Sequence, residues 1–462
     1  MCAGEKRAMK RKVYEKMLEW KAKYAGRYAL MLDGARRVGK SWLAEEFAKS
    51  EYDSYVLIDF SKAKKDVREL FNDYLDDLDT FFMMLETLMK VRLVKGRSLV
   101  VFDEVQRFPR AREAIKHLVK DGRFHYIETG SLISIKKNVE DILIPSEEMH
   151  LDVRPMDFEE FLWATGNPVM MDAIRSVLAS GKEFGQSLHR QMIVAFRQYL
   201  VVGGMPQAVA EFVRSHDLDL VDGAKREVLR IYRQDIHKFG GRLRHRIESV
   251  WDEIPAQLSK HEKRFKPGDI EPDLKMRDLK EAFHWLQEAR TVNIAYNVTD
   301  PNVGLKMTMD GFALKGYLAD TGLLISHAFD ENELAAAEIH RRLLFDRIEL
   351  NEGMLMENMV CQMVVASGRK PYFYSRINPS KAEERMEIDF LLSKTKTGRR
   401  KNIVPLEVKS AKRYTQVSLD KFRGKFRQYI DRPTVLDVND RHAKDGVTYL
   451  PIYATPAFLE GI

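Results

Sequence analysis

One segment near the N-terminus constrains the fold more than any other part of the chain. An apolar run, residues 28–32, is followed by GARRVGKS (Gly34 to Ser41) and then by an apolar helical pattern at 42–47. This order of strand, loop and helix satisfies the pattern G-x-x-x-x-G-K-[ST], in which backbone N–H groups and a helix N-terminus face phosphate groups. Further apolar runs without alternation predict a parallel α/β sheet with both faces covered.

This loop predicts a site for a nucleoside triphosphate and magnesium. Lys40 is expected to contact the β- and γ-phosphates, and the Ser41 hydroxyl is expected to ligate Mg²⁺. The residues expected to bind ATP in this loop are Gly34, Ala35, Arg36, Arg37, Val38, Gly39, Lys40, Ser41 and Trp42.

A second apolar run, residues 98–102, ends in two carboxylates. Asp103 is expected to hold the magnesium shell, and Glu104 to polarise the attacking water as general base. Two adjacent acids at a strand end also occur as ordinary surface-loop residues. After the next strand-like run, either Thr129 or Ser131 offers a hydroxyl to the γ-phosphate, or the segment is only a strand-end turn.

The pattern along the chain predicts four modules. Residues 1–165 resemble an α/β nucleotide-binding domain, and 166–240 are helical, as a lid would be. Residues 241–328 read as helix, helix and hairpin, the order of a winged helix, a module that binds DNA or packs against protein. Residues 329–462 return to an α/β order.

The last module carries a second group of candidate site residues. Glu387-Ile388-Asp389 begins one strand pattern, and Glu407-Val408-Lys409 follows on another. Glu407 and Lys409 are two apart, so they point to the same face of a strand. Asp389 and Glu407 are expected to hold Mg²⁺ or Mn²⁺, and Lys409 to orient or deprotonate the water that attacks a phosphodiester. The alternative is two amphipathic strands with polar outer faces.

Positive charge is concentrated near this group. The whole chain has 76 Lys plus Arg against 69 Asp plus Glu, a net charge of +7. Residues 394–427 alone hold twelve Lys or Arg against two acids, a net charge of +10. This density predicts a nucleic-acid partner, since phosphate backbones are bound mainly through Lys and Arg. A solvated basic face is the alternative.

Other classes of protein are excluded by composition. The only cysteines, Cys2 and Cys361, provide no disulfide framework and no Cys-x-x-Cys site. No signal-peptide core and no apolar stretch of bilayer length occurs, which predicts a cytoplasmic protein without a membrane partner.

Several motifs together resemble a known family. GARRVGKS, DEVQ at 103–106, ETGS at 128–131, VRPMDFEEF at 153–161 and YLVVGGMPQAV at 199–209 are similar to a large prokaryotic family of AAA+/STAND-type P-loop ATPases with a C-terminal domain of unknown function. The resemblance implies an AAA+ parallel sheet, a helical lid, a winged helix and a C-terminal α/β domain similar to PD-(D/E)XK restriction endonucleases.

The resemblance also assigns roles to individual residues. Asp389, Glu407 and Lys409 match the D…(E/D)-x-K pattern of the nuclease-like fold, and Glu357 matches an extra metal-binding acid from its first helix. Pro206 resembles the lid proline that packs on adenine, or else is a helix-breaking turn. Spacing selects no arginine finger, so another copy or a protein partner would supply one.

Two functional hypotheses follow. In the first, a magnesium-dependent ATPase uses its nucleotide state to control a basic, nucleic-acid-binding, nuclease-like domain. In the alternative, ATP occupancy controls a binding switch or scaffold for a protein partner, and the nuclease-like domain is not catalytic.

Overall fold

The structure is a computed structural model that consists of two compact units. The first contains residues 1–154 with 288–290, and the second contains residues 155–287 with 291–462. The structure describes residues 9–130, 146–329, 352–376, 385–394, 401–411 and 413–462.

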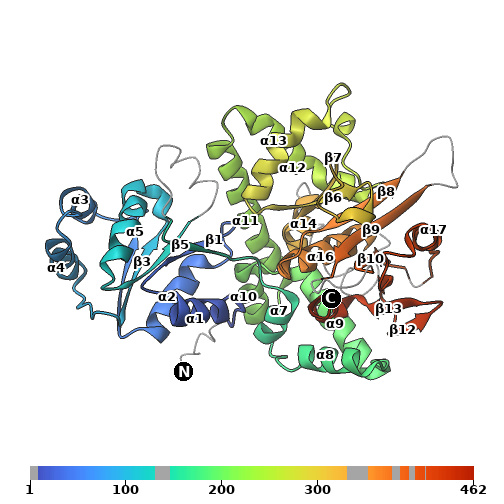
Figure 1. Ribbon diagram of the computed structural model, residues 1–462, viewed down its shortest axis with the longest axis horizontal. Helices are drawn as coiled ribbons and strands as arrows, with labels where there is room; N and C mark the ends of the chain where they lie inside the picture. The colour runs from blue at the N-terminus through green and yellow to red at the C-terminus, as the bar shows by residue number, and fades with distance from the viewer. Residues whose placement is uncertain (1–8, 131–145, 330–351, 377–384, 395–400, 412) are drawn as a thin grey trace. The chain divides into compact units, whose positions relative to one another are not determined.

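The first unit is built on a five-stranded parallel sheet with the order β2-β3-β4-β1-β5. Three of these strands, β1, β3 and β5, are labelled in Figure 1. The strand before the glycine-rich loop, β1, is therefore an interior strand, and one strand separates it from the acidic strand β3. This confirms the predicted parallel sheet. The strands are β1 (Ala29–Asp33), β2 (Ser54–Asp59), β3 (Ser98–Asp103), β4 (His125–Thr129) and β5 (Glu148–Asp152).

Helices cover both faces of this sheet. On one face Leu43 and Phe47 of α2 are fully buried, and on the other α3, α4 and α5 share one apolar core with Met31 and Phe102. Both faces being covered explains why the strands are continuous apolar runs. The helices are α1 (Val13–Lys23), α2 (Lys40–Glu51), α3 (Lys65–Asp73), α4 (Leu78–Met89), η1 (Val105–Arg107) and α5 (Pro109–Asp121).

The second unit contains an eight-stranded mixed sheet with the order β12-β13-β11-β10-β9-β8-β6-β7. Its middle strands β8, β9 and β10 are antiparallel neighbours, whereas β10 and β11 are parallel. The strands are β6 (Val292–Val298), β7 (Met309–Leu318), β8 (Tyr372–Arg376), β9 (Met386–Ser393), β10 (Ile403–Val408), β11 (Thr434–Asp437), β12 (His442–Lys444) and β13 (Val447–Pro451).

The helices of the second unit confirm the helical pattern predicted after residue 166 and the helix-helix-hairpin order that follows it. Among them, α16 is buried along most of its length. The helices are α7 (Phe158–Ala164), α8 (Met170–Ser180), α9 (Gln186–Val202), α10 (Pro206–Ser215), α11 (Leu218–Phe239), η2 (Gly241–Leu243), α12 (Arg244–Ser259), η3 (Pro267–Asp269), α13 (Met276–Glu288), η4 (Pro301–Val303), α14 (Thr321–Ala328), α16 (Glu352–Ala366), α17 (Val417–Phe426), η6 (Ile452–Ala454) and α18 (Thr455–Glu460).

The hairpin β6–β7, expected as the wing of a winged helix, does not stand alone. β6 also pairs in parallel with β8 through Tyr296–Tyr372 and Asn297–Phe373, so hairpin and C-terminal strands form one sheet. The predicted boundary between 328 and 329 thus falls within a single sheet, and the four-module division stays a prediction. Within the described part of the chain, every helix is too short or too polar to cross a membrane.

Candidate nucleotide site and C-terminal charged cluster

The glycine-rich loop has the curled backbone that its sequence predicts. Gly34 has φ +151°, and a Cβ atom there would lie 2.2 Å from the carbonyl oxygen of Val153. Gly39 and Arg37 also have positive φ angles, +93° and +66°. Only glycine fits at position 34, because any side chain would collide with backbone.

Lys40 begins α2, and its side chain folds back into this loop. Its Nζ donates to the carbonyl oxygens of Gly34 (3.0 Å) and Ala35 (2.7 Å). Burial lowers the pKa of Lys40 to about 8, although Glu104 opposes this shift. Within the described residues Lys40 forms no ion pair, so a buried ammonium is held by neutral carbonyl groups. Such a site fits a phosphate anion.

The ends of three elements meet beside the loop. The Ser41 hydroxyl donates to Asp103 Oδ1 at 2.7 Å, and the Thr129 hydroxyl donates to the same oxygen. The backbone N–H of Glu104 donates to Thr129 Oγ1 at 3.3 Å. A hydroxyl and a carboxylate in contact are oxygen donors of the kind that Mg²⁺ prefers, so these residues fit the metal that the motif implies.

Glu104 has an unusual backbone conformation directly after β3. Its φ is +55°, which costs a non-glycine residue about 1–3 kcal/mol. Its Oε2 accepts a hydrogen bond from Gln106 Nε2 at 2.8 Å. Gln106 was not among the predicted site residues, although it lies in the DEVQ motif. Strained backbone conformations of this kind are concentrated at functional sites.

The other residues predicted to bind ATP lie in different parts of the chain, and not all of them are among the described residues. Arg36 and Val38 lie within the loop, and Val38 O accepts a hydrogen bond from Arg11 Nη1 at 3.0 Å. Trp42 is exposed on α2. Ser131 lies outside the described residues. Pro206 is the first residue of α10 in the second unit, so its contact with adenine stays a prediction.

Two glycines before Pro206 allow a close approach of three backbone segments. A Cβ on Gly203 would lie 2.2 Å from Asp320 Oδ1, and one on Gly204 would lie 2.0 Å from Met156 O. Asp320 is fully buried and accepts hydrogen bonds from the backbone N–H groups of Gly204 (2.5 Å) and Leu323 (2.9 Å). These contacts fix the turn between α9 and α10 against α14.

The predicted acids of the C-terminal module lie on neighbouring strands. β9 and β10 pair antiparallel through Phe390 and Leu406, which brings Asp389 beside Glu407. Asp389 Oδ2 accepts a hydrogen bond from the N–H of Val408 at 2.8 Å. Lys409 lies directly after β10, and its Nζ is 3.0 Å from Glu407 Oε2. The structure therefore brings Asp389, Glu407 and Lys409 together.

Burial changes the acidity of these carboxyl groups. It raises the pKa of Asp389, and the nearby Glu357 raises it further. Burial also raises the pKa of Glu407 to about 7, against the opposing effect of Lys409. Glu407 is 2% exposed, and its Oε1 accepts no hydrogen bond from the described residues.

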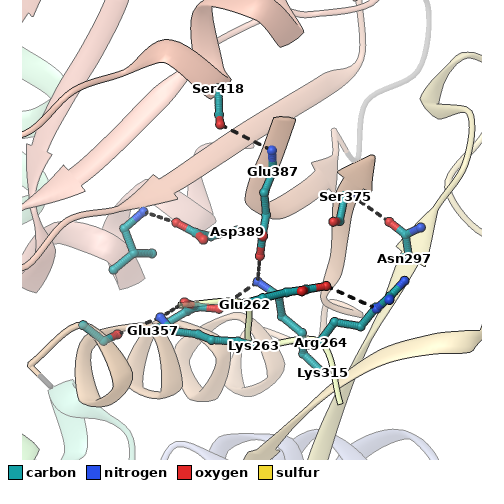
Figure 2. Close-up of polar contacts among 12 residues, drawn as sticks. Glu262, Lys263, Arg264, Asn297, Lys315, Glu357, Ser375, Glu387, Asp389 and Ser418 are labelled. Atoms are coloured by element: carbon teal, nitrogen blue, oxygen red, sulfur yellow. Dashed lines mark hydrogen bonds and ion pairs between the residues drawn. The ribbon is translucent and has the colours of Figure 1, made fainter. Parts of the chain in front are cut away.

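Glu357 on α16 lies in the same region, but lysines surround it (Figure 2). Lys315 Nζ is 3.1 Å from Glu357 Oε1 and 2.8 Å from Glu387 Oε1. Lys263 pairs with Glu357 Oε2, and the Tyr317 hydroxyl donates to Oε1. Burial would raise the pKa of Glu357, yet Lys263 and Lys315 lower it to about 2. We name Glu357, Glu387, Asp389, Glu407, Lys263, Lys315 and Lys409 the charged cluster.

Lys263, Lys315 and Tyr317 were not predicted from the sequence. Lys315 interrupts the apolar strand pattern of residues 313–318, and this is the signal that could have pointed to it. Among the described residues no three His, Cys, Asp or Glu side chains form a group able to hold a metal ion. The role of Glu357 as a metal ligand therefore stays a prediction.

Part of the basic segment 394–427 is also described. Lys394 pairs with Asp431 at 2.5 Å, and Arg423 pairs with Asp420 at 3.4 Å. Residues 395–400 and 412, which include four of its basic side chains, lie outside the described residues. The nucleic-acid partner stays a prediction.

Three segments of the chain match known protein families. Residues 26–162 match a family described as an AAA domain. Residues 193–333 match the domain of unknown function DUF8612, and residues 352–454 match the domain of unknown function DUF4143. A comparison with curated protein sequences gives no match.

Similarity to solved structures is weak. The chain is 13% identical to PCH-2 of C. elegans, with a TM-score of 0.23, over 47% of this chain and 65% of PCH-2, which is less than two thirds of that protein. It is 14% identical to the Hef helicase domain of Pyrococcus furiosus, with a TM-score of 0.18, over 61% of this chain and 74% of that domain. The family match, the parallel sheet and the loop geometry lead to one conclusion: the chain carries an AAA-type P-loop domain at residues 26–162.

Proposed function

We propose that the chain binds Mg²⁺ and ATP at the P-loop and hydrolyses ATP there. The observation that carries this proposal is the meeting of Lys40, Ser41, Asp103 and Thr129 around one curled loop. Lys40 offers a buried positive charge whose partners, in the part of the chain that the structure describes, are carbonyl groups alone, and a bound phosphate would supply the missing negative charge.

Each side chain has a distinct task in this reaction. When bound, Mg²⁺ would neutralise charge on the β- and γ-phosphates, with Ser41 and Asp103 holding its shell. Lys40 would bind the same phosphates, and the Thr129 hydroxyl would contact the γ-phosphate. Glu104 would accept the proton of the attacking water, with Gln106 fixing one of its carboxylate oxygens.

Lys40→Ala tests nucleotide binding. It should weaken ATP affinity ~100-fold, because charge-assisted hydrogen bonds contribute ~1.5–3 kcal/mol and more than one is lost. Titration of a fluorescent ATP analogue into the full chain measures this loss. Lys49→Ala, an exposed lysine of the same helix that pairs with Glu45, is the matched control. Unchanged affinity in Lys40→Ala would contradict the proposed site.

We further propose that nucleotide state controls a nuclease-like C-terminal domain that binds nucleic acid through residues 394–427. The element order α16-β8-β9-β10-α17-β11 and the proximity of Asp389, Glu407 and Lys409 support this proposal. A divalent ion would activate water at Asp389 and Glu407, whose oxygen donors suit Mg²⁺ or Mn²⁺. Lys409 would orient that water.

One observation favours the alternative, in which this domain only binds a partner. Lysines already neutralise Glu357 and Glu387, and a cluster satisfied in this way has no need of a metal ion. DNA and RNA incubated with Mn²⁺ separate the two functions, with Asp389→Ala as the comparison. Cleavage by the wild type alone supports the nuclease. Binding that weakens steeply with salt, without cleavage, supports a nucleic-acid-binding domain, and no binding at low salt supports a protein partner.

A further inference from the structure

An arginine near the N-terminus contacts the P-loop from outside the domain at residues 26–162. Arg11 lies two residues before α1 and is 5% exposed. Its Nη1 donates to Val38 O at 3.0 Å, and its Nη2 donates to Arg154 O at 2.7 Å. One buried guanidinium group therefore joins the P-loop to the segment that follows β5.

The segment after β5 packs closely against the base of the P-loop. The N–H of Val153 donates to Asp33 O at 2.7 Å, and Val153 O is the atom that a Cβ on Gly34 would strike. Val38 Cγ2 would lie 3.3 Å from the same Cβ. The two chain segments that Arg11 holds are therefore already in contact through Gly34.

The hydrogen bond to Val38 O fixes the direction of one peptide unit in the loop. The N–H of this unit belongs to Gly39, the residue before α2. In a trans peptide the C=O and N–H groups point in opposite directions, so the Gly39 N–H points away from Arg11. Glycine has a wide choice of backbone conformations, and Gly39, at φ +93°, needs contacts that select one of them. Backbone N–H groups of such a loop are the donors that face phosphate.

The helix α1 holds Arg11 in place. It packs along α2, where the Tyr14 hydroxyl donates to Glu51 Oε1 at 3.0 Å (Figure 1). Trp20 is buried, and its Nε1 donates to the carbonyl oxygen of Tyr28, which directly precedes β1, at 3.0 Å. The helix is thus attached to the elements on both sides of the P-loop. This attachment reduces the conformational entropy that Arg11 loses when it binds the loop.

We propose that Arg11 is a positioning residue for the triphosphate: it holds the Val38–Gly39 peptide so that the Gly39 N–H donates to a bound phosphate. The inference rests on the proposed function, because it concerns the same ATP site. Arginine suits this task, since its planar fork reaches two carbonyl groups at once, whereas lysine has a single ammonium group. The bond to Arg154 O fixes the plane of the guanidinium group, and the bond to Val38 O acts on the loop.

Titration of a fluorescent ATP analogue with Mg²⁺ into the full chain tests this role. Arg11→Met should weaken the affinity ~10-fold, since one donor to a charged phosphate is no longer aimed. In steady-state hydrolysis KM should rise by a similar factor while kcat changes less than ~2-fold, because this donor binds the ground state and the transition state alike. Arg11→Lys retains a donor and should lose less affinity than Arg11→Met.

Two control variants separate positioning of the loop from anchoring of α1. Tyr14→Phe removes the hydrogen bond between α1 and α2 and leaves the loop contacts in place. Lys16→Met removes an exposed positive charge from α1. Both should bind the analogue like the wild type. If Tyr14→Phe loses as much affinity as Arg11→Met, Arg11 only anchors the helix and the proposal is wrong.

The remaining outcomes separate this inference from the proposed function. If Arg11→Met binds the analogue as tightly as the wild type while Lys40→Ala does not, the ATP site stands and the positioning role is wrong. If the wild type itself does not bind, the proposed function is wrong and the inference fails with it. Should thermal melting show that Arg11→Met unfolds, Arg11→Gln takes its place, and an unchanged affinity in that variant would equally contradict the proposal.

Discussion

The P-loop and the charged cluster differ in how their buried charged side chains are neutralised. At the P-loop, the only partners of the Lys40 ammonium among the described residues are the carbonyl groups of Gly34 and Ala35. In the charged cluster, three lysines lie among four acids, and both oxygens of Glu357 are engaged. At the P-loop, an anionic ligand is needed to neutralise the lysine. In the charged cluster, lysines of the chain already neutralise most of the acids. A ligand can therefore bind at the P-loop directly, but at the charged cluster it must first displace a side chain.

The largest effect is expected at Glu104 beside the P-loop, where a substitution should change the rate of ATP hydrolysis rather than the affinity for ATP. Glu104→Gln should lower the ATP hydrolysis rate ~1,000-fold, or ~4 kcal/mol, because a general base is lost. ATP affinity should change little, since Lys40 and Ser41 remain. Phosphate release under single-turnover conditions measures the rate. Glu113→Gln, at a partly exposed acid of α5 that pairs with Arg110, should leave the rate unchanged. A full rate in Glu104→Gln would show that another group activates the water.

The next effect is on folding, at the completely buried Lys315. Lys315→Met removes the cation between Glu357 and Glu387, and it should destabilise the second unit by about 3 kcal/mol, as expected when one partner of a buried pair is lost. Denaturant unfolding of the full chain measures the change. Lys260→Met, a partly exposed lysine, should cost less than ~1 kcal/mol. Equal stability of the two variants would mean that the charged cluster does not depend on its lysines.

The smallest effect is expected in the first unit, where the contribution of His150 to stability should depend on pH. Hydrogen bonds from His150 to Asp33 and to Glu148 raise the pKa of His150 to about 9. A raised pKa in the folded state stabilises most below the unfolded value of about 6.5, and this contribution is lost as pH rises through about 9. His150→Gln should thus melt a few degrees lower than the wild type at pH 6, and the difference should shrink by pH 9. His117→Gln, on the exposed side of α5, should show no such trend.

Much of the first unit could be predicted from its sequence, because its signals are local. The strand before Gly34, the strand ending at Asp103 and the contacts of Ser41 lie close to motifs with fixed spacing. The position of Glu357 beside Asp389 could be predicted only by resemblance. Its partner Lys263 is 94 residues distant and Lys315 is 42 residues distant, and no local pattern specifies contacts of that range.

The same limit applied to the hairpin β6–β7. Its two strands and the helices before it were predicted from periodicity, but its pairing with β8 depends on a strand that begins at Tyr372. Gln106 was missed for another reason: a single amide next to Glu104 has no spacing that distinguishes it from a surface glutamine.

The pairing of β6 with β8 has a consequence for how the chain is made. When β6 and β7 leave the ribosome they can form their hairpin at once, yet the outer edge of β6 has no partner until Tyr372 and Phe373 have been synthesised. The free N–H and C=O groups of an unpaired strand edge can form hydrogen bonds with strands of other chains, which leads to aggregation. A nascent chain of this protein therefore exposes an unpaired strand edge during that interval, and shielding by a chaperone, or rapid synthesis of residues 319–371, would favour its correct folding.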